Sequence, residues 1–307
     1  MKIVLPVAGN GLRLRPYTEN VPKCLLPVAG KTILDWIVED SLGLKPSETI
    51  FITGYKADAV DSFLKQRPSW GATRTVLQSN PQGLGEAISL SLPYVDDNEP
   101  MLIILGDTLF EADLSILNNM DENVLYTYKV EDPRRFGVAV TDSTGRISRL
   151  VEKPQEFVSD EAIVGIYYIK DTKVLKESLK YLMDNNIRTK NEFQLTDALE
   201  MMIEKGCKFR TAPVQKWLDC GLAETLLETN ARVLNRNDNS STVNIPGVKV
   251  IAPCYIGKNA KISNSTIGPN VAVGDGCIIE NSTISDAVLW DSVKVESKTL
   301  NNVIVHE

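Results

Sequence analysis

The feature that most constrains the fold is a short periodic pattern near the end of the chain. An aliphatic residue followed by a small or polar residue recurs every five or six positions, at Ile256, Ile262, Ile267, Val273, Ile279 and Ile284. Such a period is typical of a parallel β-helix, in which each step forms one flat face and the aliphatic side chains stack inside. Residues 243–307 would supply about three or four coils of a left-handed parallel β-helix. The alternative is a β-sandwich with fortuitous spacing.

The preceding part of the chain predicts an α/β architecture. Short apolar runs suited to buried strands alternate with stretches of helical spacing. The expected strands are Ile3–Ala8, Thr49–Thr53, Arg74–Gln78 and Met101–Leu105, and the expected helices are Lys31–Leu42, Ala57–Lys65 and Gly85–Leu92. This alternation favours a largely parallel, doubly wound, Rossmann-like sheet, whose ligands lie beyond the carboxyl ends of the strands.

Further along, polar turns separate segments that predict antiparallel strands, so the whole sheet should be mixed. The expected strands are Val124–Val130, Gly137–Thr141, Ile147–Glu152 and Ile163–Ile169, and the expected helices are Val174–Met183, Gln194–Lys205 and Leu222–Leu234. The segment Asn235–Thr242 is polar and aperiodic, as expected of a linker. The sequence therefore predicts two domains, at 1–235 and 243–307.

Composition excludes several classes of function. The net charge of −7 argues against sequence-independent nucleic-acid binding, which relies on a basic surface. The N-terminus lacks a signal-peptide pattern, and no apolar run is long enough to span a membrane, so we expect a cytoplasmic protein with no membrane partner. The five cysteines are scattered without a CxxC pair, which indicates neither a zinc site nor a disulfide framework. The one histidine is His306, next to the end of the chain, which disfavours histidine-based catalysis.

The first expected strand runs into a glycine loop with cations nearby. Gly9 and Gly11 allow the backbone to leave the strand with its N–H groups exposed. Arg13, Arg15 and Lys23 follow, and both residue types bind phosphate. A bare GxG after a strand is often only a tight turn, and this one is neither the dinucleotide fingerprint nor a P-loop. The whole run nevertheless predicts a cradle for a polyphosphate.

This run resembles the signature loop of the sugar-1-phosphate nucleotidyltransferases, G-x-G-[ST]-R-L-x-P-x-T followed by P-K-x-L-L-P-V. The matching residues are Gly9, Gly11, Arg13, Leu14, Pro16, Thr18, Pro22, Lys23, Leu25, Leu26, Pro27 and Val28. Leu12 departs from the pattern, because Ser or Thr is usual there. Further motifs in the right order extend the resemblance to about residue 235, and it implies the nucleotide-diphospho-sugar transferase fold.

The resemblance implies a role for each matching residue. Arg13, Lys23 and Lys153 would be catalytic, and Asp107 and Asp219, in Gly-Asp and Trp-x-Asp-x-Gly motifs, would hold Mg²⁺. The nucleotide-binding residues would be Ala8, Gly9, Gly11, Gln78 and Gly83, and the sugar-phosphate-binding residues Gly137, Glu152, Lys153, Gly165, Tyr167 and Glu192. Taken alone, Glu152-Lys153-Pro154 is typical of a charged surface turn, and Asp219 could simply cap the next helix.

We therefore expect transfer of a nucleotidyl group from a nucleoside triphosphate to a sugar 1-phosphate. Gln78 and the Gln82–Ala87 segment resemble the base-recognition loop of the pyrimidine-using branch of the family, and a Gln side chain, which can both donate and accept, suits the imide edge of thymine or uracil. The resemblance therefore favours dTTP or UTP, with glucose 1-phosphate as the favoured sugar. Mannose-1-phosphate guanylyl transfer, an acyltransferase and a weakly catalytic regulatory subunit that binds nucleotide sugars are the alternatives. Thr108 and Cys220, where Asn and Thr are frequent, are further departures. The sugar, dTTP against UTP, the role of the β-helix and homo-oligomer formation stay open.

Overall fold

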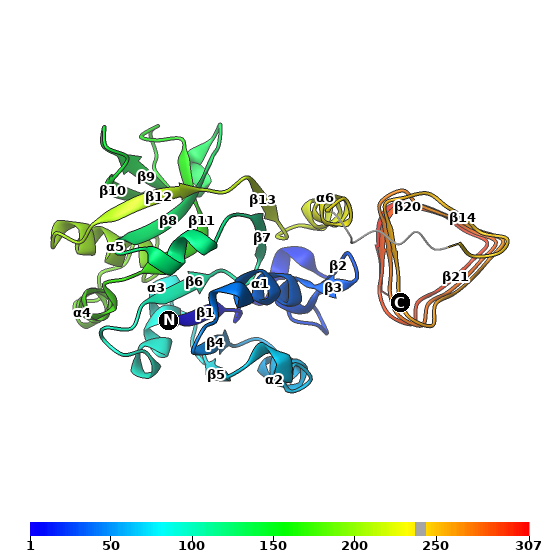
Figure 1. Cartoon of the computed structure of the whole chain (residues 1–307), viewed down its shortest axis with the longest axis horizontal. Helices are drawn as coiled ribbons and strands as arrows, with labels where there is room; N and C mark the ends of the chain where they lie inside the picture. The colour runs from blue at the N-terminus through cyan, green and yellow to red at the C-terminus, as the bar shows by residue number, and fades with distance from the viewer. Residues whose placement is uncertain (237–243, 307) are drawn as a thin grey trace. The chain divides into compact units, whose positions relative to one another are not determined.

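The structure is a computed structural model that describes residues 1–236 and 244–306 (Figure 1). The chain forms two compact units, Met1–Asn10 with Ile37–Trp217, and Gly11–Trp36 with Leu218–Glu307. The predicted linker Asn235–Thr242 lies outside the described residues from position 237 onward. The predicted division into 1–235 and 243–307 therefore stays a prediction.

The first unit contains a nine-stranded sheet with the order β10-β9-β11-β6-β1-β4-β5, while β8 pairs with β11 and β12. The bounds are β1 (Lys2–Pro6), β4 (Glu48–Thr53), β5 (Thr73–Leu77), β6 (Met101–Ile104), β8 (Asn123–Lys129), β9 (Gly137–Thr141), β10 (Ile147–Glu152), β11 (Glu161–Ile169) and β12 (Phe209–Pro213). β1 pairs in parallel with β4 and β6, and β4 with β5, whereas β11 runs antiparallel to β6. The predicted mixed, doubly wound sheet is confirmed.

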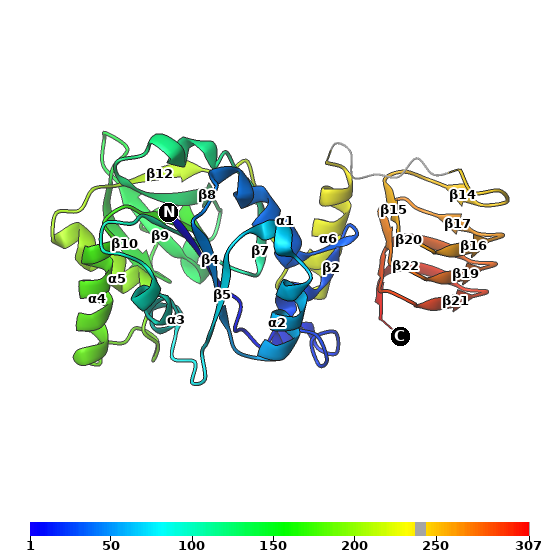
Figure 2. The same ribbon diagram turned by 60° about the horizontal axis from the view of Figure 1, so that its bottom comes forward.

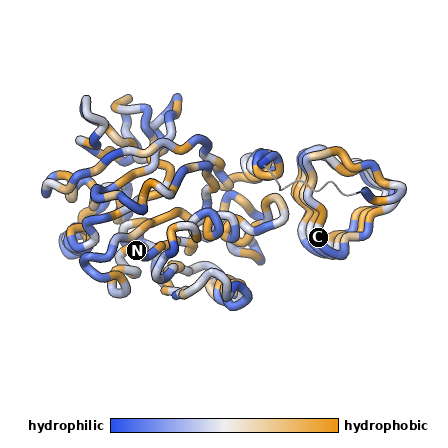
Figure 3. Tube along the Cα trace, in the orientation of Figure 1, coloured by the Kyte–Doolittle hydropathy of each residue, from blue (hydrophilic) through white to orange (hydrophobic). Residues whose placement is uncertain are grey.

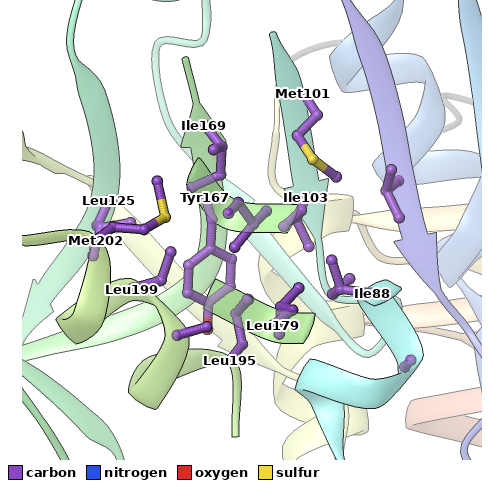
Figure 4. Close-up of a cluster of buried hydrophobic side chains, with 14 of the residues drawn as sticks. Ile88, Met101, Ile103, Leu125, Tyr167, Ile169, Leu179, Leu195, Leu199 and Met202 are labelled. Carbon is purple, nitrogen blue, oxygen red and sulfur yellow. The ribbon is translucent and has the colours of Figure 1, made fainter. Parts of the chain in front are cut away.

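Helices α3 (Leu84–Ser91), α4 (Thr172–Asp184) and α5 (Leu195–Glu204) pack against one another, and α3 and α5 also contact the sheet. Their apolar side chains meet those of the central strands in one buried cluster (Figure 4). Ile103 of β6, Ile88 of α3 and Leu199 of α5 have no exposed surface, and burial of each stabilises the fold by about 1.5–3 kcal/mol. Because helices cover the strands, the central strands are apolar almost throughout.

The chain passes from β1 to β4 and β5 on one side and then returns to β6 on the other side of β1. This reversal makes β1 the switch point of the sheet, where doubly wound proteins bind ligands. The carboxyl ends of β1, β5 and β6 share one edge because these strands are parallel, so Ala8, Gln78 and Asp107 follow at the same edge.

The second unit contains α6 (Ala223–Leu234), the short pair β2 (Pro27–Val28) and β3 (Lys31–Thr32), and a stack of parallel strands. Partners in the stack lie 17 or 16 residues apart, as in Cys254↔Val271 and Val271↔Ala287 (Figure 2). The strands are β14 (Lys249–Val250), β15 (Cys254–Ile256), β16 (Lys261–Ser263), β17 (Thr266–Ile267), β18 (Val271–Val273), β19 (Ile278–Glu280), β20 (Thr283–Leu289), β21 (Lys294–Glu296) and β22 (Thr299–Val305). The predicted parallel β-helix is confirmed.

The periodic residues have the predicted roles in this β-helix. Ile267, Val273, Ile279 and Ile284 are fully buried in its interior, and hydrophobic residues recur at matching places in successive coils (Figure 3). The corners carry residues with left-handed backbone, such as Asn264, Asn281 and Ser297, with φ of 47°, 49° and 52°. Asn tolerates this conformation because its short side-chain amide can form hydrogen bonds with the neighbouring backbone. The repeat thus alternates a core residue with a corner residue.

Most other predicted elements agree with the structure within a few residues, and α2 (Ala57–Lys65) matches its prediction at both ends. One difference is the start of α1 (Ile33–Ser41), since Lys31–Thr32 belong to β3 instead. The strands β7 (Thr108–Glu111), β12 and β13 (Lys216–Asp219) were not predicted. β7 and β13 form a two-stranded sheet of their own. Among the described helices, none has the length and apolar character needed to cross a membrane.

Candidate active site

The residues singled out in the sequence occur in both units, and each unit is described by itself. The first unit contains Ala8, Gly9, Gln78, Gly83, Asp107, Gly137, Glu152, Lys153, Gly165, Tyr167 and Glu192, and the second contains Gly11, Arg13, Lys23 and Asp219.

Glycines allow close backbone packing at the carboxyl edge of the sheet. A Cβ built on Gly54 would lie 2.8 Å from the Cβ of Ala8, and one on Gly106 would lie 2.5 Å from Val7 Cγ1. The carbonyl of Ala8 accepts a hydrogen bond from Tyr55 N at 3.2 Å, which fixes the exit of β1. Asp107 follows Gly106 directly and is half-buried, at the same edge of the sheet as Ala8 and Gln78.

Polar side chains converge around Gly137. Glu152 is its cross-strand partner, and a Cβ built on Gly137 would lie 2.9 Å from Glu152 Oε2. The Thr196 hydroxyl, at the start of α5, donates to the same oxygen at 2.8 Å. Lys153 forms an ion pair with Glu152 at 3.4 Å and has a left-handed backbone, with φ of 46°. The structure therefore brings Gly137, Glu152 and Lys153 together.

Tyr167 lies beside this group but is buried, and its ring packs near Leu195 and Leu199 (Figure 4). Burial raises the pKa of its phenol, and the negative charges of Glu152 and Asp107 raise it further. Its own burial raises the pKa of Asp197; a hydrogen bond from Thr189 opposes this effect, and the charge of Glu152 adds to it. Asp107 and Glu152 thus lie within electrostatic reach of one tyrosine, although Glu152 ends β10 and Asp107 lies between β6 and β7.

Gln78 and Gly83 belong to a tightly bonded segment. Gln78 Nε2 donates to Glu86 Oε2 at 2.6 Å, and Gly83 has a φ of 122° that favours glycine. A Cβ on Gly83 would also lie 2.5 Å from the carbonyl oxygen of Phe193. The N–H of Phe193 donates to Gln82 O at 2.9 Å, and Arg188 donates to the side chain of Gln82 at 2.6 Å.

Glu192 precedes Phe193 and lies in a tight turn closed by reciprocal backbone bonds with Thr189, at 3.0 and 3.2 Å. Lys190 and Asn191 form the tip of this turn with φ of 55° and 65°. Gln194 Nε2 donates to Glu192 Oε2 at 3.1 Å. The segments predicted to contact the base and the sugar are therefore hydrogen-bonded neighbours.

In the second unit the glycine loop folds back on itself. Gly11 has a φ of 59°, and its carbonyl accepts a hydrogen bond from the buried hydroxyl of Thr18 at 2.9 Å. A Cβ on Gly11 would lie 2.9 Å from Thr18 Cγ2 and 3.2 Å from Lys23 Cβ, so glycine is required for this close approach. The loop thus places the Cβ of Lys23 close to Gly11.

Arg13 and Asp219 lie beside the same glycine. A Cβ on Gly221 would lie 2.8 Å from Asp219 Oδ1 and 3.3 Å from Arg13 Nη2. Asp219 Oδ1 accepts the N–H of Gly221 at 2.9 Å. The N-cap of α6 is Leu222, so Asp219 does not cap that helix.

Comparison with known proteins identifies the family of this chain. The sequence profile of the family described as nucleotidyl transferase matches residues 2–236. The chain belongs to the nucleotidyl transferase family. A relative from Streptomyces antibioticus, a glucose-1-phosphate thymidylyltransferase, is 28% identical over 94% of this chain and 87% of its own length. The bifunctional protein GlmU of Methanocaldococcus jannaschii is 33% identical over 77% of this nucleotidyltransferase, which spans 55% of that relative.

Solved structures show the same fold. A structure from Bacillus anthracis assigned as a glucose-1-phosphate thymidylyltransferase is 28% identical, with a TM-score of 0.65 over 77% of this nucleotidyltransferase and 96% of that chain. A UDP-glucose pyrophosphorylase complexed with UDP-glucose has a TM-score of 0.64 over 76% of this chain and 97% of that chain. Its sequence identity of 23% supports a shared fold alone.

Nucleotidyltransferases of this family generally use a divalent metal, and the donors in this chain suit one. Within 1–236 and 244–306, no three His, Cys, Asp or Glu side chains gather as a ready metal cage. A hard ion that takes one or two carboxylates and completes its shell with water and phosphate oxygens needs no such cage. Asp107 and Asp219 each lie at a strand end and offer carboxylate oxygens of this kind.

The structure adds the partners that fix several of the candidate side chains, of which only Arg188 lies outside the segments that resemble the family. Thr196 holds Glu152, Glu86 holds Gln78, and Arg188 holds Gln82. Thr196 belongs to a Leu-Thr-Asp-Ala string that resembles the family pattern, which was a usable signal. Arg188 carried none, because its partner is 106 residues away.

Proposed function

We propose that this nucleotidyltransferase joins a sugar 1-phosphate to a nucleoside triphosphate, with release of pyrophosphate. The favoured substrates are dTTP or UTP and glucose 1-phosphate. The observation that carries the proposal is the position of Asp107, Gln78 and the Glu152 group at the ligand-binding edge of the doubly wound sheet. The glucose-1-phosphate thymidylyltransferase relative, which aligns with 94% of the chain, supports the choice of substrates.

The chemistry requires no general base. The sugar phosphate is already mostly ionised near pH 7, because the second pKa of a phosphate monoester is about 6. Its oxygen attacks the α-phosphorus in line, and the protein aligns the reactants and neutralises charge. Arg13 stabilises the charge that builds on the leaving pyrophosphate, and Lys23 binds the nucleotide phosphates. Catalysis without an active-site histidine is therefore consistent with this sequence.

The sugar side uses the group around Gly137. Glu152 accepts hydrogen bonds from sugar hydroxyls, while Thr196 fixes the orientation of its carboxylate. Lys153 binds the sugar phosphate, and its 3.4 Å ion pair with Glu152 keeps the ammonium beside that carboxylate. The absence of a side chain at Gly137 leaves the carboxylate of Glu152 open to a sugar ring, whereas the absence of one at Gly165 makes room for the side chain of Leu105.

Asp107 and Asp219 are the residues that would hold Mg²⁺. When bound, the ion supplies positive charge to phosphate oxygens, which lowers the energy of the pentavalent transition state.

The test is pyrophosphate release by the purified protein with Mg²⁺. dTTP, UTP, CTP, GTP and ATP are each paired with glucose, mannose, galactose and N-acetylglucosamine 1-phosphates. We expect the strongest rate with dTTP or UTP and glucose 1-phosphate. A maximum with GTP and mannose 1-phosphate would replace the favoured substrates. A blank grid in which nucleotide sugars still raise the melting temperature would favour a binding subunit.

Two substitutions test the assigned roles. Lys23→Ala and Asp107→Ala should each lose most of kcat without a change in melting temperature. Lys129→Ala and Asp113→Ala are matched controls, because both side chains are exposed and remain outside the proposed site, and they should leave kcat unchanged. Near-normal turnover of either test variant would contradict its role.

A further inference from the structure

The strongest unexplained feature of the first unit is a buried pair of polar side chains, Gln78 and Glu86. Gln78 follows the end of β5 and is 7% exposed, and Glu86 lies in the first turn of α3 and is 9% exposed. Gln78 Nε2 donates to Glu86 Oε2 at 2.6 Å. The same oxygen accepts the backbone N–H of Gln82 at 3.2 Å. A buried carboxylate with two donors on one oxygen is a fixed acceptor.

This pair determines which way the amide of Gln78 faces. A glutamine amide has a donating NH₂ limb and an accepting C=O limb, and the two have nearly the same shape. Glu86 Oε2 already accepts the Gln82 N–H, so the limb of Gln78 that faces this oxygen is the donating NH₂ limb. The opposite orientation would put two oxygen acceptors together in a buried place, without a proton between them. The Oε1 atom of Gln78 is therefore on the limb that faces away from Glu86.

We propose that Glu86 fixes Gln78 so that its Oε1 selects bases with a ring N–H and rejects bases with a bare ring nitrogen. The inference rests on the proposed function, in which Gln78 contacts the base. Thymine and uracil present N3–H beside a carbonyl, which matches Oε1 and the remaining Nε2 proton. Cytosine presents an unprotonated N3, so two acceptors would oppose each other. Guanine also carries a ring N–H next to a carbonyl, so this device separates UTP from CTP and GTP from ATP.

The experiment compares two substitutions at Glu86. Glu86→Gln keeps a carbonyl oxygen that can be held by the Gln82 N–H and can still accept from Gln78. Glu86→Met fills the same space without an acceptor, so the Gln78 amide can turn over. The measurement is kcat/KM for UTP, dTTP and CTP with a saturating sugar 1-phosphate. The ratio of UTP to CTP should fall about tenfold or more in Glu86→Met, the discrimination that a well-placed hydrogen-bonding pair provides, and should stay within about twofold in Glu86→Gln.

A control on the same helix separates selectivity from stability. Ser91→Ala removes a buried hydroxyl that bonds within α3, to Ile88 O at 2.7 Å, and should leave the UTP-to-CTP ratio unchanged. A merely structural role for Glu86 predicts equal losses with every nucleotide and an unchanged ratio, which would overturn the inference. Equal loss of selectivity in Glu86→Gln and Glu86→Met would also overturn it, since charge rather than amide orientation would then be responsible.

The failure of this inference differs from the failure of the proposed function. If the wild-type protein turns over UTP or dTTP and Glu86→Met keeps the wild-type ratio, only the role of Glu86 is wrong. If the wild-type protein prefers GTP, the proposed substrates are wrong, and the GTP-to-ATP ratio in Glu86→Met still tests the amide. If Glu86→Met does not fold, Gln78→Glu supplies the test: it places a carboxylate against Glu86 and should reduce kcat/KM for UTP more than for CTP.

Discussion

Asn230 of α6 joins three segments of the second unit, and its removal should destabilise them measurably. The side chain is fully buried. Its Oδ1 accepts the N–H of Ala29 at 2.9 Å, and its Nδ2 donates to Asn270 O of the β-helix at 3.1 Å. Ala29 is 3% exposed and has a φ of 49°, so this turn is held against a backbone preference.

The size of the effect follows from these two bonds. Asn230→Ala leaves the buried N–H of Ala29 without its partner, which costs about 1–3 kcal/mol, and removes a second bond worth about 1 kcal/mol. We therefore expect a loss of about 2–4 kcal/mol in the local stability of this unit. Hydrogen exchange of peptides that contain Ala29 should show protection lower by about 30- to 1,000-fold.

Two further variants make this result interpretable. Asn235→Ala removes an exposed amide that bonds to Ala231 O on the same helix, and its effect should be below about 0.5 kcal/mol. Asn230→Asp keeps the acceptor for Ala29 but places an oxygen against Asn270 O, so Ala29 should stay more protected than in Asn230→Ala. Protection in Asn230→Ala within about threefold of wild type would refute the reasoning, because no large local free energy would then depend on these bonds.

Three other predictions follow from the same kind of argument. Gly165→Ala should lower the free energy of unfolding, measured by urea titration, by about 2–4 kcal/mol. The reason is that φ of Gly165 is 88° and the new Cβ would lie 2.7 Å from Leu105 Cγ. An unchanged midpoint of urea unfolding would contradict this prediction. Burial would raise the pKa of Glu48, but hydrogen bonds from Lys2 and Arg74 outweigh it and lower the pKa, so Glu48→Gln should cost about 1 kcal/mol at pH 7. That difference should be fully present above the usual glutamate pKa of 4.5 and should shrink as the pH falls through the lowered pKa of the folded Glu48, and a difference that does not shrink on acidification would exclude the mechanism. Removal of divalent metal with EDTA should abolish pyrophosphate release, and added Mg²⁺ should restore it, whereas persistent activity in EDTA would contradict the metal requirement.

The sequence predicted the elements whose signals are local. Val273 and Ile284 are at the expected steps of the β-helix, and Ala57–Lys65 has the expected helical bounds. These predictions agree with the structure because the spacing of apolar side chains along the sequence follows which side chains are buried. The strands β7, β12 and β13 were missed because each is short, has little alternation, and is defined by the strand that pairs with it. These strands depend on pairing with segments that are distant in the sequence, and the local spacing of apolar residues gives no information about such pairing.

The sequence by itself determined the residue types of the candidate site, because the motifs around Gly11, Lys23, Asp107 and Glu152 are contiguous and their chemistry is local. Only the tertiary structure showed which other side chains form hydrogen bonds with these residues. Thr196 reaches Glu152 from 44 residues away, and Asn230 joins Ala29 over 201 residues. Glu86 lies only eight residues from Gln78, yet the turn at Gly83 is what brings its carboxylate to the amide. Hydrogen bonds depend on distance and angle, and folding sets these for residues that sequence spacing leaves unrelated.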